Sequence, residues 1–458
     1  MNMKYLPSST LWKGALFLFV LSVIAIHATT TLQIGLISDD YDLIAHAKEG
    51  KNLWSLHFSP FLTFLWKQTQ LGTFPVFAWK LLVITFHLLN VYLVYLIAKI
   101  GLKVSLPAAI LASALYATSP ISMEALTWTC CAGYVLSGTW IFLTLILYER
   151  IQNLSGFLSG TLFVILQILA ILTWDWGIFL FPVLGLYALT NKKSLSPLIP
   201  VSVVWSLISV WRIFSPYQTG WHENNLTTVV YNLLGAPVLG FLPQMDKTFF
   251  FSIPGYLITG IIWSLLLFGS WKNRKAASLL IAFILFTALW AIRGNPSSRY
   301  FYVPMAFLDL VLVTAIDQIP WRKGAIIGLI FFVGLQWIWM EERAQLWKMA
   351  YQESIHLSDQ IALVTLRHPE KEITIVNLPE SYGPPSLPLR AQFWFGGLDT
   401  LFPNIHVVKT IGSPFHWEKR QGLLTREEIK NIYKEQPIYE VVHTHHHDWR
   451  SFKLQEWE

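Results

Sequence analysis

The sequence predicts an all-α membrane protein that crosses the bilayer about eleven times and ends in a small α/β domain. Hydrophobic residues make up 54% of the 458 residues and charged residues only 13%, about half of the share that is typical of soluble domains. The apolar residues form blocks of about 15 to 22, which suits membrane-spanning helices. Lysines and arginines stand at the ends of these blocks, as they do in membrane proteins.

The composition excludes several other classes of protein. Strand-length alternation of polar and apolar residues is absent, which excludes an outer-membrane barrel. The formal charge of +6 and the isoelectric point near 9.1 could indicate nucleic-acid binding. The basic residues lie at helix ends, however, so we expect no nucleic-acid partner. Cys130 and Cys131 are adjacent, and this spacing matches neither a disulfide framework nor a metal-binding motif.

The first apolar block, 13–37, is expected to be a retained span. It follows a short basic N-terminus like a secretory signal, but it lacks a small-residue cleavage site and continues directly into a charged segment. Further spans are expected at 75–98, 106–118, 134–148, 156–172, 177–189, 198–213, 250–271, 276–292, 301–316 and 324–340.

The basic residues between these spans set the expected orientation. With the N-terminus in the cytoplasm, the short inner loops carry Lys99, Lys103, Arg150, Lys192, Lys193, Lys272, Arg274, Lys275, Arg322 and Lys323, as the positive-inside rule requires. The clustered acids then lie outside, in the segments 38–74, 119–133, 173–176, 214–249, 293–300 and after 340. We therefore expect a multi-pass protein of the plasma (cytoplasmic) membrane whose working face is the non-cytoplasmic one. Apolar, Trp-rich stretches at 53–66 and 225–242 are expected to lie as helices in that interface.

Residues 1–340 are expected to form the transmembrane domain, and residues 341–458 a soluble extracytoplasmic α/β domain. The second part contains a helical run to 367, strand-like stretches at 372–377 and 406–411, a helix at 425–435 and strands near 438–443 and 450–454. This length suffices for one small domain. We find no tetratricopeptide or other repeat in it.

An acidic run, Ser38-Asp39-Asp40-Tyr41-Asp42, follows the first span directly. Asp39 or Asp40 could act as a general base toward a hydroxyl group. Two of the carboxylates could instead hold a divalent cation, Mg²⁺ or Mn²⁺, that bridges phosphate oxygens. A structural alternative is that Ser38 or Asp39 caps an interfacial helix that begins at Tyr41.

Two more acids lie in outer segments that hold little other charge. Glu124 follows Pro120, which breaks the third span, and an isolated acid at such a depth is costly unless it is paired or functional. We treat Glu124 as a third catalytic candidate and, with Asp40, as a candidate metal ligand; alternatively it ends a helix. Asp175, between Trp174 and Trp176, is a candidate substrate-binding residue, although simple turn chemistry also explains it.

Basic and polar residues on the same face are candidates for binding phosphate. Arg299 and Tyr300 begin the tenth span and could clamp a phosphate at the membrane surface. His222 and Lys247 could assist them. The alternative is that these side chains contact the headgroups of membrane lipids.

The order and sidedness of four motifs resemble the GT-C superfamily of polytopic glycosyltransferases. The resemblance is to the branch of protein O-mannosyltransferases and transmembrane, tetratricopeptide-containing mannosyltransferases, without the repeats. Two outer-loop motifs are similar to the family's acidic motif and to its His-Pro, Glu and Trp element: Asp39-Asp40-Tyr41-Asp42-Leu43-Ile44, and Ser119-Pro120 through Glu124 to Trp128. Two more resemble its Ser-Lys-Glu stretch and its Arg-Tyr-Leu-Tyr-Leu-Pro element: Thr173-Trp174-Asp175, and Ser298-Arg299-Tyr300-Phe301-Tyr302-Val303-Pro304.

The resemblance implies a hexosyl- or pentosyltransferase that uses a polyprenyl-phosphate-linked sugar donor. The acceptor would be a lipid, a glycan or a protein on the non-cytoplasmic face. By resemblance, Asp39 or Asp40 is the catalytic base or the acid beside a metal, and Arg299 contacts the donor phosphate. Transfer of a whole glycan or lipid headgroup would need the same surface. A transporter or flippase is the non-enzymatic alternative, but such proteins usually carry repeats and polar residues near the midplane.

Overall fold

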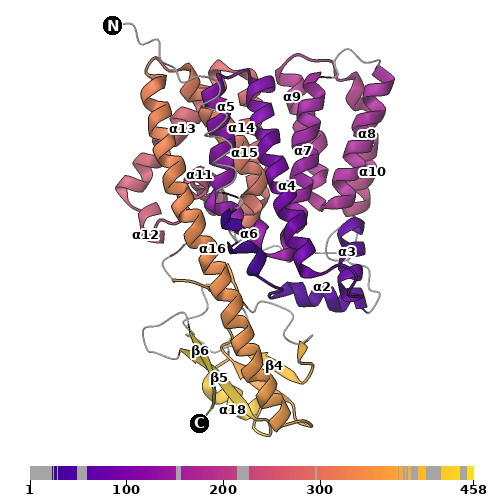
Figure 1. The fold of residues 1–458 in the computed structure, drawn as a ribbon, viewed down its shortest axis with the longest axis vertical. Coiled ribbons are helices and arrows are strands. Elements are labelled where there is room, and N and C mark those ends of the chain that lie inside the picture. The colour runs from indigo at the N-terminus through magenta and orange to yellow at the C-terminus, as the bar shows by residue number, and fades with distance from the viewer. Residues whose placement is uncertain are drawn as a thin grey trace.

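The computed structural model describes residues 23–48 (except 24 and 28), 59–150, 156–213, 226–293, 297–379, 381–384, 387, 390–393, 401–408, 424–443 and 451–457. These residues form a bundle of helices with a smaller domain, which contains a β-sheet, beneath one end (Figure 1). About half of the first expected span, 13–37, lies outside the described residues.

The long helices of the bundle follow the apolar blocks of the sequence. They are α4 (Val76–Leu96), α5 (Leu106–Thr118), α7 (Ala132–Arg150), α8 (Gly156–Thr173), α9 (Leu180–Thr190), α10 (Ile199–Ile213), α11 (Leu226–Phe241), α13 (Ile253–Lys272), α14 (Arg274–Arg293), α15 (Tyr302–Gln318) and α16 (Arg322–Arg367).

Several of these helices can cross a membrane. Among the described residues, five helical stretches are long and apolar enough to do so, and a sixth is added if Leu106–Thr118 and Pro120–Thr127, bent by 43°, count as one span. Four shorter apolar helices of 10–17 residues accompany them. The chain is therefore an integral membrane protein, whereas the expected count of about eleven spans stays a prediction.

Helix α15 forms the centre of the bundle. All of its residues from 302 to 316 are buried, and it packs against α5, α13 and α14. By contrast, α13 exposes Leu257, Ile261 and Trp271 on its outer face. Apolar side chains on the outside and the inside of one bundle are expected where the surrounding solvent is lipid.

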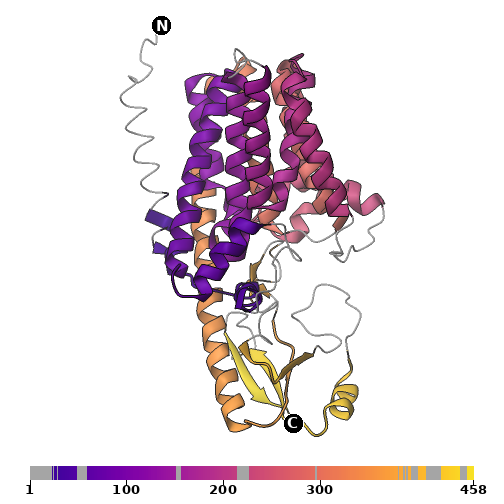
Figure 2. The ribbon, with the colours of Figure 1, turned by 90° about the vertical axis from the view of Figure 1, so that its right-hand side faces the viewer.

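Short helices gather at the end of the bundle that faces the smaller domain (Figures 1 and 2). They are α2 (Asp39–Lys48), α3 (Pro60–Gln70) and α6 (Met123–Thr127), with the 3₁₀ turns η4 (Pro120–Ser122), η5 (Thr129–Cys131), η6 (Asp175–Phe179) and η8 (Ser298–Phe301). These turns come from the segments that the sequence analysis assigned to the outer face.

Helix α16 joins the two parts of the protein. It begins at the far end of the bundle and runs without a break into the smaller domain, so the boundary expected at 340 falls within it (Figure 1). The sheet beside it has the strand order β4 (Ile405–Val408), β1 (Ile373–Val376), β5 (Ile438–His443) and β6 (Phe452–Glu456). Strand β1 is parallel to β4 and to β5, while β6 is antiparallel to β5.

The rest of the smaller domain is a short hairpin and a helix. Strands β2 (Ser381–Tyr382) and β3 (Ala391–Gln392) pair with each other, and α18 (Arg426–Ile432) precedes β5. A capping box between Thr425 and Glu428 begins α18. The expected small α/β unit is thus present.

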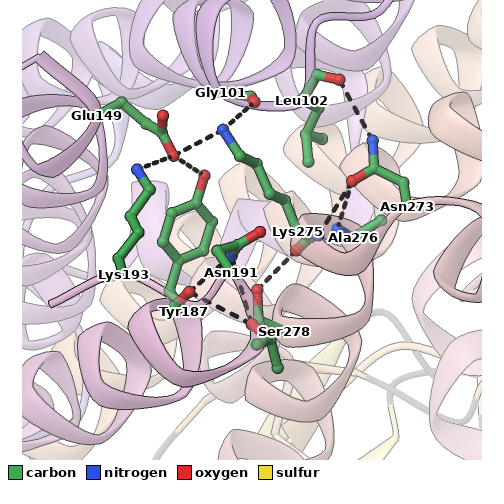
Figure 3. A network of polar contacts seen from close by, with 11 residues as sticks. Gly101, Leu102, Glu149, Tyr187, Asn191, Lys193, Asn273, Lys275, Ala276 and Ser278 are labelled. Carbon is green, nitrogen blue, oxygen red and sulfur yellow. Dashed lines mark hydrogen bonds and ion pairs between the residues drawn. The ribbon is translucent and has the colours of Figure 1, made fainter. Parts of the chain in front are cut away.

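The opposite end of the bundle is tied by a cluster that we call the Glu149 clasp: Glu149, Tyr187, Lys193 and Lys275 (Figure 3). The Glu149 carboxylate lies 2.9 Å from Lys193 Nζ and 2.8 Å from Lys275 Nζ, and it accepts a hydrogen bond of 2.5 Å from the Tyr187 hydroxyl. Lys275 also donates to the carbonyl of Gly101 at 2.9 Å. The clasp therefore connects α7, α9, α14 and the π-helical turn η3 (Ile97–Leu102).

Candidate active site

Asp40 is completely buried and links two segments that are far apart in sequence. Its Oδ2 accepts the N–H of Ile37 at 3.0 Å, and its Oδ1 accepts the N–H of Cys130 at 2.7 Å. Ser38, which precedes α2, has a φ of 55°. That left-handed conformation costs a residue other than glycine about 1–2 kcal/mol. The bonds of Asp40 thus hold a strained entry to α2 against η5.

Lys80 is a buried cation beside Asp40, in the first turns of α4. Its Nζ donates to Thr129 Oγ1 at 2.9 Å and to the carbonyl of Thr127. Its charge also lies within electrostatic range of the Asp40 carboxylate. Burial raises the pKa of Asp40 to about 7, while Lys80 and the two N–H groups act in the opposite direction. A buried acid and a buried cation therefore lie close enough to influence each other.

Glu124 holds the polypeptide turn that carries Arg299. One of its carboxylate oxygens lies 2.6 Å from Arg299 Nη1 and accepts the Ser297 hydroxyl at 2.5 Å. The other accepts the Ser298 hydroxyl and, at 3.2 Å, the N–H of Arg299. With four donors, the buried Glu124 carboxylate can stay charged. The alternative that Glu124 only ends a helix does not explain these contacts.

The guanidinium of Arg299 lies between aromatic rings. Its Cζ is 5.0 Å from the ring centroids of both Trp128 and Tyr300, a range in which cation–π attraction operates. Tyr300 stacks on Trp176 with ring centroids 6.2 Å apart and planes within 7°. The side chain of Arg299 is still 21% exposed. The guanidinium is thus fixed in place while part of it faces outward.

Trp128 connects the same region to the acidic run and to α16. Its indole N–H donates to the carbonyl of Ile37 at 3.1 Å, and its ring lies 6.2 Å from that of Trp347. Helix α16 also contributes Arg343, which is fully buried, donates to Gln244 Oε1 at 3.4 Å and lies within electrostatic range of Glu124. Three cations, Lys80, Arg299 and Arg343, therefore converge on two buried acids.

Behind these charges, polar groups tie α4 to the start of α15. The Tyr302 hydroxyl shares a hydrogen bond of 2.8 Å with His87 Nδ1 and accepts one of 3.1 Å from Asn90 Nδ2. His87 and Asn90 lie on the helix that carries Lys80, and Tyr302 follows Arg299 by three residues. These hydrogen bonds thus fix α4, which carries Lys80, relative to the turn that carries Arg299.

The structure brings together the predicted residues Asp39, Asp40, Glu124, Arg299 and Tyr300. Asp39 opens α2 and is partly exposed. Asp175 opens η6, in the turn whose Trp176 stacks on Tyr300, and Lys247 opens α12 (Lys247–Phe250). The side chains of Asp175 and Lys247, and the whole of His222, lie outside the described residues.

Sequence reasoning missed Lys80 and Arg343. Lys80 lies within the expected span 75–98, and Arg343 lies just beyond the expected span 324–340. The signal that could have found them is the rule that an ionisable residue within an apolar helix is a functional candidate by default.

The two acids named as candidate metal ligands are occupied by protein donors. N–H groups take both oxygens of Asp40, and O–H and N–H groups take both oxygens of Glu124. Within the described ranges, no three His, Cys, Asp or Glu side chains gather so that they could hold a metal ion. The cations Lys80, Arg299 and Arg343 provide positive charge in fixed positions, which suits an anionic group such as a phosphate.

Comparisons with known proteins place the fold. No family model matches the sequence, and no curated protein does. The crystal structure of ArnT from Cupriavidus metallidurans in the apo state has a TM-score of 0.51 and 15% sequence identity over 94% of this chain and 93% of that chain. The structure of the same protein bound to undecaprenyl phosphate has a TM-score of 0.45 at the same identity and coverage. The chain therefore shares the overall fold of ArnT, and at this identity the likeness concerns the fold alone. The expected GT-C superfamily and its mannosyltransferase branch stay predictions.

Proposed function

We propose that this chain is a membrane glycosyltransferase that moves one sugar from a polyprenyl-phosphate donor to a hydroxyl group of an acceptor on the non-cytoplasmic face. The observation that carries the proposal is the convergence of Lys80, Arg299 and Arg343 with the acids Asp40 and Glu124 at one end of the helix bundle. The N-terminus is cytoplasmic in this proposal, and residues 341–458 form the extracytoplasmic domain.

In the proposed reaction the acceptor oxygen attacks the anomeric carbon of the donor. The new bond forms as the bond from that carbon to the phosphate oxygen breaks, and the phosphate leaves with the electron pair. Arg299 and Lys80 stabilise the charge that grows on the phosphate. Since both lie in fixed positions before the reaction, little reorganisation is needed when the charge develops.

Asp39 is the general base in this proposal, and Asp40 is a positioning residue. Asp39 is partly exposed at the first position of α2, where it can approach the acceptor hydroxyl and take its proton. Asp40 is fully buried, and each of its oxygens accepts a backbone N–H. Its contacts with Ile37 and Cys130 hold the start of α2, where Asp39 lies, against η5.

The proposal is tested by transfer assays on the purified, detergent-solubilised protein. Labelled polyprenyl-phosphate hexoses and pentoses are offered to Asp39→Asn, Asp40→Asn and wild type. We expect Asp39→Asn to abolish turnover with little change in donor binding, and Asp40→Asn to lower both turnover and stability. Unchanged transfer in both variants would refute the assignment. A parallel series with EDTA, Mg²⁺ or Mn²⁺ shows whether a divalent cation takes part.

A second enzymatic function, transfer of a whole glycan or of a lipid headgroup, can be distinguished from transfer of one sugar by the product. Transfer of a whole glycan or of a lipid headgroup needs the same cations to hold the leaving phosphate. Mass spectrometry of the product separates the two, because an acceptor that gains one hexose or one pentose excludes transfer of a preassembled glycan.

A further inference from the structure

Cys130 and Cys131 lie side by side within the candidate active site. Both belong to η5, and their Sγ atoms are 3.7 Å apart. Cys130 is partly exposed, whereas Cys131 is buried. Both thiols lie within electrostatic range of Lys80, and Cys131 is also within range of Arg299. A chemical change at this pair therefore takes place among the charges of the site.

The segment from 127 to 131 contacts three of the charged residues of the site, Asp40, Lys80 and Arg299. The Thr127 carbonyl and the Thr129 hydroxyl hold Lys80. The N–H of Cys130 holds Asp40, and the ring of Trp128 lies under the guanidinium of Arg299. A shift of this one segment would therefore move Asp40, Lys80 and Arg299 relative to one another.

We propose that Cys130 and Cys131 form a reversible thiol–disulfide switch that turns sugar transfer off when oxidised. Cys130, which is partly exposed, loses its proton and its thiolate attacks a disulfide oxidant, R–S–S–R. One R–S⁻ leaves, and a mixed disulfide remains on Cys130. The Cys131 thiol loses its proton and displaces the second R–S⁻. The pair loses two electrons and two protons, and the oxidant gains them as two thiols R–SH.

Closing this bond requires the backbone to move. The sulfur atoms must approach from 3.7 Å to about 2.05 Å. Adjacent Cα atoms lie about 3.8 Å apart across a trans peptide, below the usual range of about 4.4–6.8 Å for bridged cysteines. The peptide between the two residues therefore rotates, and the hydrogen bond of 2.7 Å from Cys130 N–H to Asp40 is disturbed. On the non-cytoplasmic face, oxidising conditions make such a bond available.

The experiment treats the purified full-length protein with oxidised glutathione and measures intact mass, free thiols and transfer rate. For wild type we expect the loss of two hydrogens, no attached glutathione and no free thiol. We expect the transfer rate to fall at least about tenfold, since displaced charges lower catalysis by that much or more. Tris(2-carboxyethyl)phosphine should restore it. The Cys131→Ser variant should instead retain one glutathione on Cys130, and Cys130→Ser should keep its buried thiol free.

The inhibitory effect of the switch rests on the proposed sugar transfer, and the measurements test the two separately. Two free thiols in wild type, or a lasting glutathione adduct on Cys130, would overturn the proposed ring closure. A complete disulfide with an unchanged transfer rate would overturn the inhibitory effect. If the reduced protein transfers no sugar from any donor, the proposed function fails, while the mass measurement still decides whether the pair closes.

Discussion

The carboxylate of Glu124 and the guanidinium of Arg299 form an ion pair of 2.6 Å between residues that are 175 positions apart in the sequence. The pair joins α6 to η8, and the hydroxyl groups of Ser297 and Ser298 complete the coordination of the carboxylate. The third outer-face motif, at 173–176, contacts the same place through Trp176 and Tyr300. Glu124 therefore holds in place the turn that carries Arg299.

We expect Glu124→Gln to destabilise the protein and to impair transfer together. Glutamine keeps the shape but leaves the partly buried Arg299 guanidinium without its counter-charge, and we expect the free energy of unfolding to fall by about 3 kcal/mol, the lower end of the range for a broken buried ion pair. Ser297→Ala is the matched control, because it removes one hydrogen bond to the same carboxylate and leaves the ion pair intact. We expect it to lower the free energy of unfolding by about 1 kcal/mol. Thermal unfolding in detergent measures both. Equal effects of the two variants would show that the charge pairing contributes nothing.

Lys80→Met should lower kcat/KM for the donor by about 10²–10³-fold, as expected when one fixed donor to a developing charge is removed. The fold should persist, since methionine fills a similar volume and a raised pKa of about 7 allows the neighbouring Asp40 to become neutral. Lys67→Met is the control, because Lys67 is an exposed lysine on α3 at the same end of the bundle. A comparable loss in both variants would mean that only the general surface charge matters.

The sequence predicted the class of fold because lipid imposes a strong pattern on it. Continuous apolar blocks mark the helices, and the strands of the smaller domain appear where expected, at 373–376 and 438–443. The acidic run and the Arg299 turn were found because charge is rare beside apolar helices. Their partners were harder to predict, since contacts such as Ser297 to Glu124 depend on how α6 and η8 pack.

Lys80 and Arg343 show why the rest of the site is harder to predict from the sequence. A lysine near the end of a span normally extends toward water, and only the packing of α4 against the segment after α6 buries Lys80. Arg343 lies in the middle of α16, where a change from apolar to soluble composition hides the continuity of the helix. In both cases a local pattern marks the residue only as a candidate, because the packing that buries it involves segments that are far apart in the sequence.

The pKa of Asp40 predicts a dependence of stability on pH. Burial raises this pKa from 3.8 to about 7, so the folded protein binds a proton that the unfolded chain releases near pH 4. The contribution of Asp40 to stability is therefore complete below about pH 3.8 and is lost as the pH rises through 7. Asn at this position does not titrate. We expect the melting temperature of Asp40→Asn, relative to wild type, to increase between pH 4 and pH 8; a constant difference would contradict the raised pKa.

The Glu149 clasp should contribute stability without contributing to catalysis. Glu149 lies about 26 Å along α7 from Ala132, which adjoins η5 and the site. Removing its charge leaves two largely buried ammonium groups beside each other, so Glu149→Gln should lower the free energy of unfolding by about 3 kcal/mol. Lys193→Met should have a smaller effect, since Lys275 still pairs with Glu149 at 2.8 Å.

Lys192 provides the matched control for this series, because it is the exposed neighbour of Lys193. Lys192→Met should change stability by less than about 0.5 kcal/mol, as is usual for surface substitutions. Thermal unfolding then ranks the three variants, and steady-state kinetics below their melting temperatures should give the KM of wild type for the donor in each. A raised KM in Glu149→Gln alone would show that the clasp is coupled to the site through α7, because the substituted group itself lies too far away to contact the donor phosphate.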